Sequence, residues 1–210
     1  MTAARPWRCS ARSAAGFDCP TTRTPTCSAL QPIPAYLLTV AMDAVAWNPA
    51  AAALLTDFGA VAPAERNIVW PSFRCPSLRA RWLDWEATAA DLVATLRGEL
   101  GRHPNQPDIV RLVTRLSAAS AEFADWWGRY DVATQCGMNR QLRHPDAGEL
   151  HLVCEQMTVP PADQRLVTFH PAGAVTASRL ELLADLTATT TDLDEAISER
   201  TGARPLRLVR

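Results

Sequence analysis

Cysteine and histidine are the residue types in this sequence that could act as nucleophile, base or metal ligand. Cys154 and His170 fall on neighbouring predicted strands, where a thiol and an imidazole could form a nucleophile and its base. Nothing in the sequence supplies the N–H donors of an oxyanion hole, which acyl transfer needs. His151 and Cys154 are three residues apart on one predicted strand, so their side chains point to opposite faces and cannot share a metal.

The motifs of the common enzyme classes are also absent from the sequence. It has no G-x-x-x-x-G-K-[ST] phosphate loop, no G-x-G-x-x-G dinucleotide turn, no G-x-S-x-G nucleophile elbow and no H-E-x-x-H zinc motif. The four histidines are isolated from one another. We therefore predict no enzymatic activity, no metal and no cofactor.

The six cysteines favour a reducing compartment. They fall at positions 9, 19, 27, 75, 136 and 154, without a C-x-x-C and without the compact spacing of a disulfide or metal framework. The basic N-terminus has no apolar segment of the kind that secretory signals carry. No run approaches the roughly 18–20 apolar residues of a membrane span. We expect a cytoplasmic protein that is not inserted in a membrane.

Aromatic side chains are the first candidates for ligand binding. Eight of them cluster in the middle of the chain: Trp47, Trp70, Phe73, Trp82, Trp85, Phe123, Trp126 and Trp127. Individually they are expected to be core residues, but several large rigid side chains beside a curved sheet can also wall an apolar pocket. Trp47, Phe73 and Trp126 are the candidates for such walls.

Polar residues at the ends of predicted elements are the second group of candidates. Asn48-Pro49 is an efficient helix start, because Asn accepts from unpaired N–H groups and Pro at the first helical position wastes no donor. Four more polar residues lie at element ends: Arg66, Asn67, Arg143 and His144. These side chains could meet the polar head of a ligand. The alternative is a cap for Asn48 and solvated or surface-bonded side chains for the others.

Charge is unevenly distributed along the chain. Residues 34–198 contain 13 Arg and 20 Asp or Glu, a net charge of −7, whereas residues 1–33 and 199–210 are each +3. An acidic body is a poor surface for nucleic-acid phosphates. A nucleic-acid function would therefore depend on the two Arg-bearing ends, and we interpret "GARPLRLVR" as a solvated tail.

Hydrophobic periodicity predicts two strands followed by a block of helices. The strands are "AYLLTV" and "AVAWN", with Met42-Asp43 at the turn, and a helix follows from Pro49 to about Asp57. Residues 63–73 have a helical pattern that is broken at Pro71. Three clearer helices begin after the cap-like Asp84, after Pro107 and after the cap-like Ser120, each with an apolar stripe.

The period then changes to two. "RQLRH" and "ELHLVCEQMTV" flank the turn "PDAG", in which Gly148 suits a left-handed closing position, and "QRLVTFHP" is a third strand. A last helix is expected over residues 177–198. Two strands plus three can form one five-stranded antiparallel sheet with a helical block over one face and a C-terminal helix. The order predicts an α+β fold with the layout of PAS domains.

Six strings, in this order and spacing, carry a resemblance to a known family: "AWNPAAAAL", "ERNIVW", "DWEATAADLVATLRGELGRHP", "LSAASAEFADWW", "LRHPDAGELHL" and "DQRLVTFHPAG". Over about residues 33–187 the chain resembles the ligand-binding domain of MmyB-like transcription regulators. The resemblance implies a PAS-like sensor half that holds a fatty acid or similar small apolar ligand, joined to an N-terminal helix-turn-helix that binds DNA. It also suggests a homodimer.

The resemblance assigns candidate positions for the polar end of the pocket: Asn48, Arg66, Asn67, Arg143 and His144. The chain departs from the family in its first 32 residues, which show no helical periodicity where a helix-turn-helix would lie. DNA binding by this chain is accordingly not expected. Smaller departures are Cys154, where the family tends to have tyrosine, and Pro71, which interrupts an apolar helix.

Three segments follow from this comparison. Residues 1–32 are expected to be a disordered tail, residues 33–187 the PAS-like ligand-binding domain, and residues 188–210 the end of the last helix and a basic tail. The leading hypothesis is a ligand-sensing domain of a transcription regulator with an apolar internal pocket. The alternative is a dimerisation or protein-interaction module whose core is filled by its own side chains.

Overall fold

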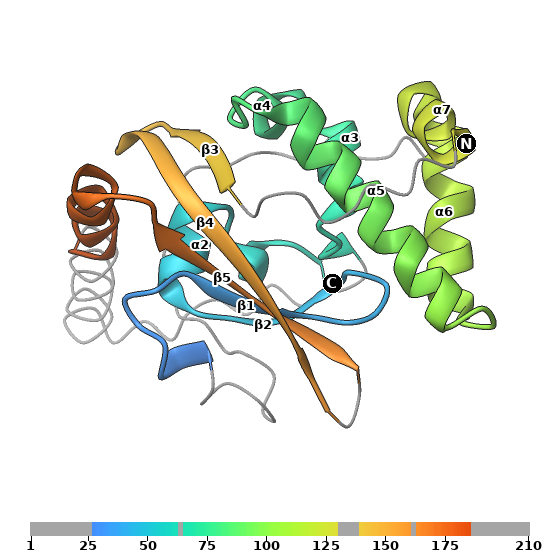
Figure 1. The fold of residues 1–210 in the computed structure, drawn as a ribbon, viewed down its shortest axis with the longest axis horizontal. Helices are drawn as coiled ribbons and strands as arrows, with labels where there is room; N and C mark the ends of the chain where they lie inside the picture. Colours follow the sequence, from blue (N-terminus) through green and yellow to red (C-terminus); the bar gives the residue numbers. More distant parts are fainter. Residues whose placement is uncertain (1–26, 63–64, 130–138, 161–162, 186–210) are drawn as a thin grey trace, which may run out of the picture.

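A five-stranded antiparallel sheet forms the centre of the computed structural model, which describes residues 27–62, 65–129, 139–160 and 163–185. The strands are β1 (Ala35–Leu38), β2 (Ala44–Trp47), β3 (Asn139–His144), β4 (Gly148–Val159) and β5 (Gln164–Pro171). Their order across the sheet is β2-β1-β5-β4-β3, and every neighbouring pair is antiparallel (Figure 1). The predicted α+β class with one five-stranded antiparallel sheet is confirmed.

Helices fill the chain between β2 and β3. They are α2 (Pro49–Leu54), the short 3₁₀ helix η1 (Phe58–Ala60), α3 (Val69–Arg74), α4 (Pro76–Arg79), α5 (Trp85–Arg102), α6 (Pro107–Ala119) and α7 (Ala121–Gly128). Figure 1 shows α3 to α7 gathered to one side of the sheet. Residues 174–185 form a further helix after β5.

The helices begin where local chemistry favours a start. The Asn48 side chain accepts from the Ala51 N–H at 2.9 Å and Pro49 occupies the first turn of α2. Ser120 caps α7 by accepting from the Phe123 N–H at 3.1 Å. The predicted caps Asn48 and Ser120 are confirmed, whereas Asp84, at the start of α5, makes no capping hydrogen bond with its side chain.

Pro71 does not break a helix, contrary to the expectation from the sequence. It is the third residue of α3, which begins at Val69. A proline is tolerated there because the first N–H groups of a helix have no intrahelical acceptor. The helix therefore starts later than residue 63 and continues through the proline.

Two tight turns set the register of the sheet. Residues 145–147 connect β3 to β4, and Gly148 has φ +71°, the left-handed conformation predicted for it. Between β1 and β2, Met42 also has a positive φ of 65°, and its N–H donates to the Thr39 carbonyl at 2.9 Å. The turn predicted at Met42-Asp43 is confirmed.

The two faces of the sheet are covered differently. The face toward the helices carries the main core, in which Leu38, Leu142 and Leu152 pack against Leu96, Leu116 and other helical side chains. On the opposite face a smaller cluster of Ala35, Leu37, Ala46 and Leu166 packs against Cys27. A cavity in the main core would therefore lie between α5 and the sheet.

Several predicted segments extend outside the described residues. Of the tail expected over residues 1–32, the structure describes residues 27–32, where Cys27 is fully buried. The helix expected over 177–198 is described as far as residue 185, and the basic tail of 188–210 lies outside. Within the described ranges no helix combines the length and the hydropathy needed to cross a membrane.

Candidate functional site

An internal cavity lies between the helix-facing side of the sheet and the helices that cover it. The sheet contributes the side chains of Tyr36, Leu38, Arg140, Cys154, Gln156, Val167 and Phe169 to its wall. The covering segments contribute Met42, Leu55, Thr56, Phe58, Ile68, Pro71, Ser72, Leu78, Trp82, Thr88, Asp91, Leu92 and Thr95. Most of this wall is aliphatic or aromatic, as expected for a site that holds an apolar molecule.

The cavity is large enough for more than ordered water. About 90 Å³ of it can hold the centre of a water molecule, whereas a single enclosed water needs roughly 10–15 Å³ by the same measure. Empty space of this size costs packing energy, because the atoms that line it lose partners on one side. A bound apolar ligand would restore those contacts.

One buried ion pair forms part of the cavity wall. Arg140 on β3 donates from Nη2 to the Asp91 carboxylate on α5 at 2.5 Å, and from Nη1 to the Asn139 carbonyl at 3.0 Å. The side chains of Arg140 and Asp91 are 9% and 23% exposed. Burial of a charge is tolerated only with such pairing, so this contact ties the middle of α5 to the edge of the sheet.

Two further titratable groups of the wall stay uncharged near neutral pH. Burial raises the pKa of the Tyr36 hydroxyl above its ordinary value, and the neighbouring Cys154 adds to this shift. Burial also raises the pKa of the Cys154 thiol to about 11, against the opposing effect of Arg140. A thiol with a raised pKa is a poor nucleophile at neutral pH.

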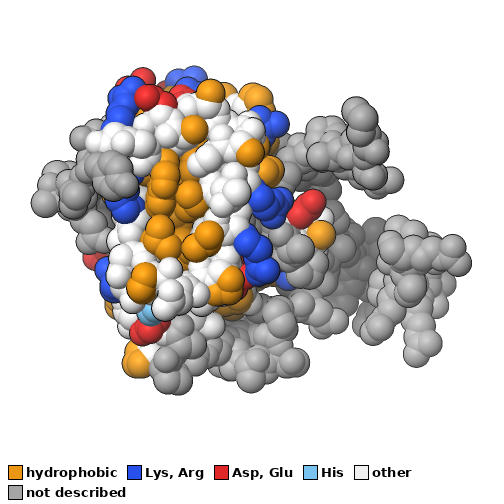
Figure 2. All heavy atoms as spheres, turned by 90° about the vertical axis from the view of Figure 1, so that its right-hand side faces the viewer, with side chains coloured by type: hydrophobic (Ala, Val, Ile, Leu, Met, Phe, Trp, Pro, Cys, Tyr) orange, Lys and Arg blue, Asp and Glu red, His pale blue; other side chains and the backbone are white. Residues whose placement is uncertain are grey.

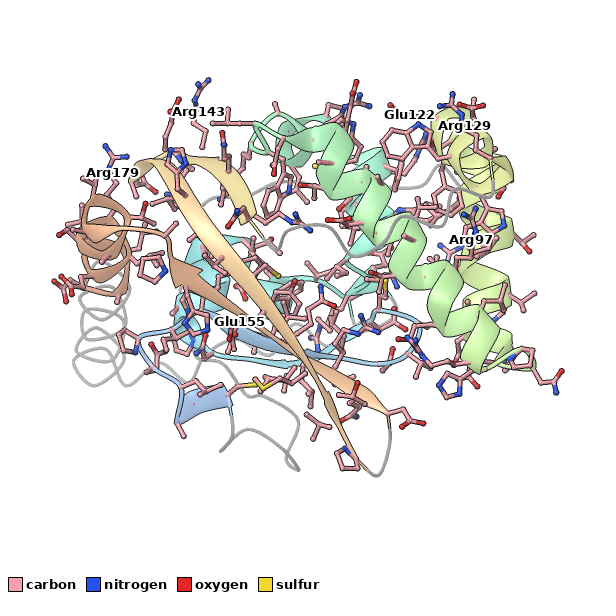
Figure 3. The ribbon with its side chains drawn as sticks, viewed as in Figure 1. Arg97, Glu122, Arg129, Arg143, Glu155 and Arg179 are labelled. Atoms are coloured by element: carbon pink, nitrogen blue, oxygen red, sulfur yellow. The ribbon has the colours of Figure 1, made fainter. Side chains whose placement is uncertain are left out.

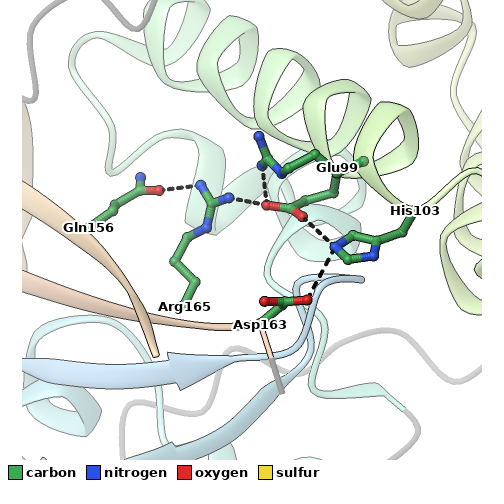
Figure 4. Close-up of polar contacts among 6 residues, drawn as sticks. Glu99, His103, Gln156, Asp163 and Arg165 are labelled. Atoms are coloured by element: carbon green, nitrogen blue, oxygen red, sulfur yellow. Dashed lines mark hydrogen bonds and ion pairs between the residues drawn. The ribbon is translucent and has the colours of Figure 1, made fainter. Parts of the chain in front are cut away.

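A second polar cluster joins the C-terminal part of α5 to β4 and β5 (Figure 4). Glu99, only 5% exposed, contacts Arg165 and accepts from Arg102 at 2.5 Å. Arg165 also donates to Gln156 Oε1 at 2.7 Å, and Gln156 is part of the cavity wall. His103 lies 3.8 Å from the Glu99 carboxylate. α5 is thus held to the sheet by two buried ion pairs about two turns apart.

Asn48 does not reach the cavity wall, because its side chain is fully used elsewhere. It is completely buried, and Oδ1 accepts from the N–H groups of Ala51 at 2.9 Å and Ala35 at 3.0 Å. Nδ2 donates to the carbonyls of Cys27 at 3.0 Å and Ile33 at 2.7 Å. Besides capping α2, Asn48 therefore joins β1 and the preceding segment to the start of the helix.

Asn67 and Arg66 also make local structural contacts. Asn67 Nδ2 donates to the Ala41 carbonyl and to Asp43 Oδ1, both at 2.8 Å, while Oδ1 accepts from two N–H groups at the start of α3. Arg66 Nε donates to the Val61 carbonyl at 2.9 Å, and its guanidinium lies 5.1 Å from the centre of the Trp47 ring. Neither residue belongs to the cavity wall.

Arg143 and His144 are neighbours in sequence but lie on opposite faces of β3. Arg143 is exposed at the β3–β4 hairpin and bonds Glu149 at 2.7 Å, which lowers the pKa of that carboxyl (Figure 3). His144 is 6% exposed, and its Nε2 lies 2.9 Å from the Ala53 carbonyl. The N–H groups of Asp146 and Ala147 point to its Nδ1. This pattern assigns the proton to Nε2, and burial, followed by the charge of Arg81, lowers the pKa of His144.

The three aromatic candidates belong to the core around the cavity, outside the set of side chains that line it. Trp47 packs on Phe58, with ring centres 5.4 Å apart, and Phe58 is a wall residue. Phe73 makes edge contacts with Phe123 at 5.2 Å and Trp126 at 6.3 Å. Trp47 therefore contacts the wall through Phe58, and the eight candidate residues do not converge on one point.

The Cys154–His170 pair considered as a nucleophile and base is not formed. Cys154 pairs across the sheet with Phe169, whereas His170 pairs with Val153. Because neighbours on a strand face opposite ways, the Cys154 thiol lies in the core while the His170 ring contacts Thr168 Oγ1 at 3.0 Å. Among the described residues, no group of three or more His, Cys, Asp or Glu side chains could hold a metal ion.

The polar wall residues Arg140 and Asp91 were missed by the sequence interpretation. Strand alternation in "RQLRH" places Arg140 on the same face as Leu142 and His144, which is a usable signal. Thr88, Asp91 and Thr95 are spaced by three and four, so they share one face of α5. That Arg140 meets Asp91, 49 positions away, has no local signal.

Comparison with known proteins gives one family match. The family model described as MmyB-like transcription regulator ligand binding domain matches residues 26–183. A search of curated proteins finds no match for this chain. The matched range begins one residue before the first described residue and includes the whole sheet, all the labelled helices and the cavity.

Proposed function

The chain belongs to the family of MmyB-like transcription regulator ligand binding domains, and we propose that it senses a fatty acid or similar small apolar ligand held in the cavity beneath α5. The family is one of ligand-binding domains, which indicates a non-enzymatic role. The observation that supports the ligand class is the cavity itself, whose wall is mainly apolar with a few polar groups. The order of strands and helices supports the PAS-like sensor interpretation.

Burial of the ligand chain supplies most of the binding free energy in this proposal. Each buried CH₂ group contributes about 0.8 kcal/mol, so a medium-length chain gives several kcal/mol without any polar contact. The polar groups of the wall then orient the head. Arg140 and Tyr36 belong to the wall and are better placed to orient the head than Asn48 or Arg143, which lie outside it. A ligand role for Asn48 and Arg143 stays a prediction from the family resemblance. We also propose a cytoplasmic location, which the scattered cysteines of the sequence favour.

The test combines extraction with binding. Mass spectrometry of an organic extract from the purified protein identifies any retained lipid. Thermal unfolding is then measured with a series of fatty acids and with the matching alcohols and methyl esters. A ligand at about 100 times its Kd stabilises the folded state by about 2.7 kcal/mol, a rise in Tm of roughly 5–10 °C for a chain of this size.

A matched pair of variants links the binding to the cavity. Cys154→Phe introduces a ring into the cavity from β4, where Cys154 is 4% exposed. Met157→Phe introduces the same ring on the opposite face of the same strand, where Met157 is 50% exposed. The proposal expects ligand-induced stabilisation to be lost in the first variant and kept in the second. An empty extract and no stabilisation of the wild type by any chain would contradict it.

Self-association is a second candidate function, and it is favoured by an exposed apolar surface. Figure 2 shows hydrophobic side chains gathered in a band between arginines on the side of the molecule formed by the helices. Val110 on α6 is 46% exposed. In the alternative hypothesis the last helix, from Ala177, and the Trp-rich block form the interface and side chains fill the core, which the presence of the cavity disfavours. Sedimentation equilibrium over a range of protein concentrations measures whether a dimer forms, with and without ligand.

A further inference from the structure

The charge of Arg140 is already neutralised inside the cavity wall. Its Nη2 lies 2.5 Å from the Asp91 carboxylate, and both side chains belong to the wall. These two are the charged residues of the wall within the described part of the chain. A ligand that enters the cavity therefore meets a neutral ion pair and not a free cation.

The remaining titratable groups around the pair do not supply a counter-charge. Tyr36 on β1 and Cys154 on β4 face the cavity, and burial raises the pKa of both, the thiol to about 11. Glu155 acts on Cys154 from the next position of β4, but its own side chain is exposed on the other face. The wall is consequently neutral near pH 7.

The cavity wall nevertheless has hydrogen-bond donors that are not used within the described residues, on Tyr36 and on Arg140. The Tyr36 hydroxyl is in a side chain that is 6% exposed, lines the cavity, and has no hydrogen-bond partner among the described residues. Arg140 presents five N–H groups in total, and the contacts to Asp91 and Asn139 occupy two of them. Because the Tyr36 side chain lines the cavity, an acceptor oxygen on a ligand could receive a hydrogen bond from its hydroxyl.

We propose that the cavity selects chains with an uncharged polar head, and that Asp91 is the residue that sets this specificity. A hydroxyl, amide, ester or protonated carboxyl can accept from Arg140 or Tyr36 without adding charge. An ionised carboxylate would place a second negative charge beside the same guanidinium in a low-dielectric site, where like charges disfavour each other. A fatty acid then binds only by taking up a proton. This inference rests on the proposed ligand-binding function of the cavity.

The experiment is isothermal titration calorimetry with decanoic acid and 1-decanol, in two buffers of different protonation enthalpy. For the wild type at about pH 7.5, we expect 1-decanol to bind more tightly, and decanoic acid to bind with uptake of about one proton. The affinity for decanoic acid should fall about tenfold for each pH unit above the acid's own pKa, while that for 1-decanol stays constant.

Asp91→Asn tests the assignment directly. The substitution keeps the size of the side chain and removes its charge, so Arg140 becomes available to a carboxylate. A hydrogen bond to a charged group is worth enough for a gain of about tenfold or more in decanoic acid affinity, now without proton uptake. Glu99→Gln is the matched control, because it neutralises the other buried carboxylate of α5, which does not line the cavity. It should leave the ratio of the two affinities unchanged within about twofold.

The outcomes separate this inference from the function on which it rests. If neither decanoic acid nor 1-decanol binds, the ligand-binding proposal itself fails and the inference falls with it. If both bind but the wild type prefers ionised decanoate without proton uptake, or Asp91→Asn weakens decanoate binding, the cavity is a ligand site and the specificity assignment is wrong. The pH series on the wild type decides the question even where Asp91→Asn fails to fold.

Discussion

Replacement of Asn48 by Ala should cost at least about 3 kcal/mol of unfolding free energy. The change removes four hydrogen bonds of 2.7–3.0 Å from a side chain that has no solvent exposure. Loss of a helix cap alone costs about 1 kcal/mol. The N–H of Ala35 and the carbonyl of Ile33 would also lose their partner, at about 1–3 kcal/mol for each group left unsatisfied, whereas the carbonyl of Cys27 keeps the Leu30 N–H at 3.2 Å.

Asn48→Asp distinguishes this joining role from simple capping. Asp and Asn are equally good caps, so a residue that only capped α2 would tolerate the exchange. In the structure Nδ2 donates to two carbonyl oxygens, those of Cys27 and Ile33. A carboxylate oxygen at that position would face both carbonyls without a proton to share. We therefore expect Asn48→Asp to be destabilised by more than about 2 kcal/mol.

The assay is urea unfolding followed by circular dichroism and tryptophan fluorescence, with Asn105→Ala as the control. Asn105 is exposed in the connection between α5 and α6, and its replacement should change stability by less than about 0.5 kcal/mol. An Asn48→Asp variant as stable as the wild type would refute the joining role and leave Asn48 as a cap. Ligand affinity measured on the folded fraction should be unchanged in both Asn48 variants.

Two further predictions concern the β3–β4 hairpin. Burial lowers the pKa of His144, so the unfolded chain binds a proton more readily than the folded one. The stability of the wild type should therefore fall as the pH drops below about 6.5. In paired thermal melts, the Tm of His144→Asn should fall less than that of the wild type between about pH 7.5 and 5.5. Gly148→Ala places a Cβ at φ +71° with only the Arg179 guanidinium nearby at 3.8–3.9 Å, so backbone strain without a clash should cost about 1–2 kcal/mol by urea unfolding; a stability equal to wild type would show that the turn relaxes.

Local sequence signals predicted most of the fold. The alternation of β3 and of the first half of β4, the apolar stripes of α5 to α7 and the caps Asn48 and Ser120 depend on neighbours within a few positions, and the structure confirms them. In β5 the four residues from Leu166 to Phe169 are all buried, so burial does not alternate there. The error at Pro71 had a local cause as well, since a proline breaks a helix in its interior but not in its first turn. What could be read locally was largely read correctly.

The candidate site could not be predicted in the same way, and the reason is physical. Polar residues at the ends of elements, such as Asn48, Asn67 and His144, meet unpaired backbone groups there, and their side chains are used to join one element to the next. Polar residues in the middle of an element have no such local demand. When Arg140 and Asp91 face the core from mid-strand and mid-helix, they must be paired with each other or with a ligand. The stronger indication of a binding site is therefore a charged residue that shares the buried face of its strand with leucines, as Arg140 does with Leu142. Its partner Asp91 lies on α5 and can be identified only from the fold, which places α5 beside β3.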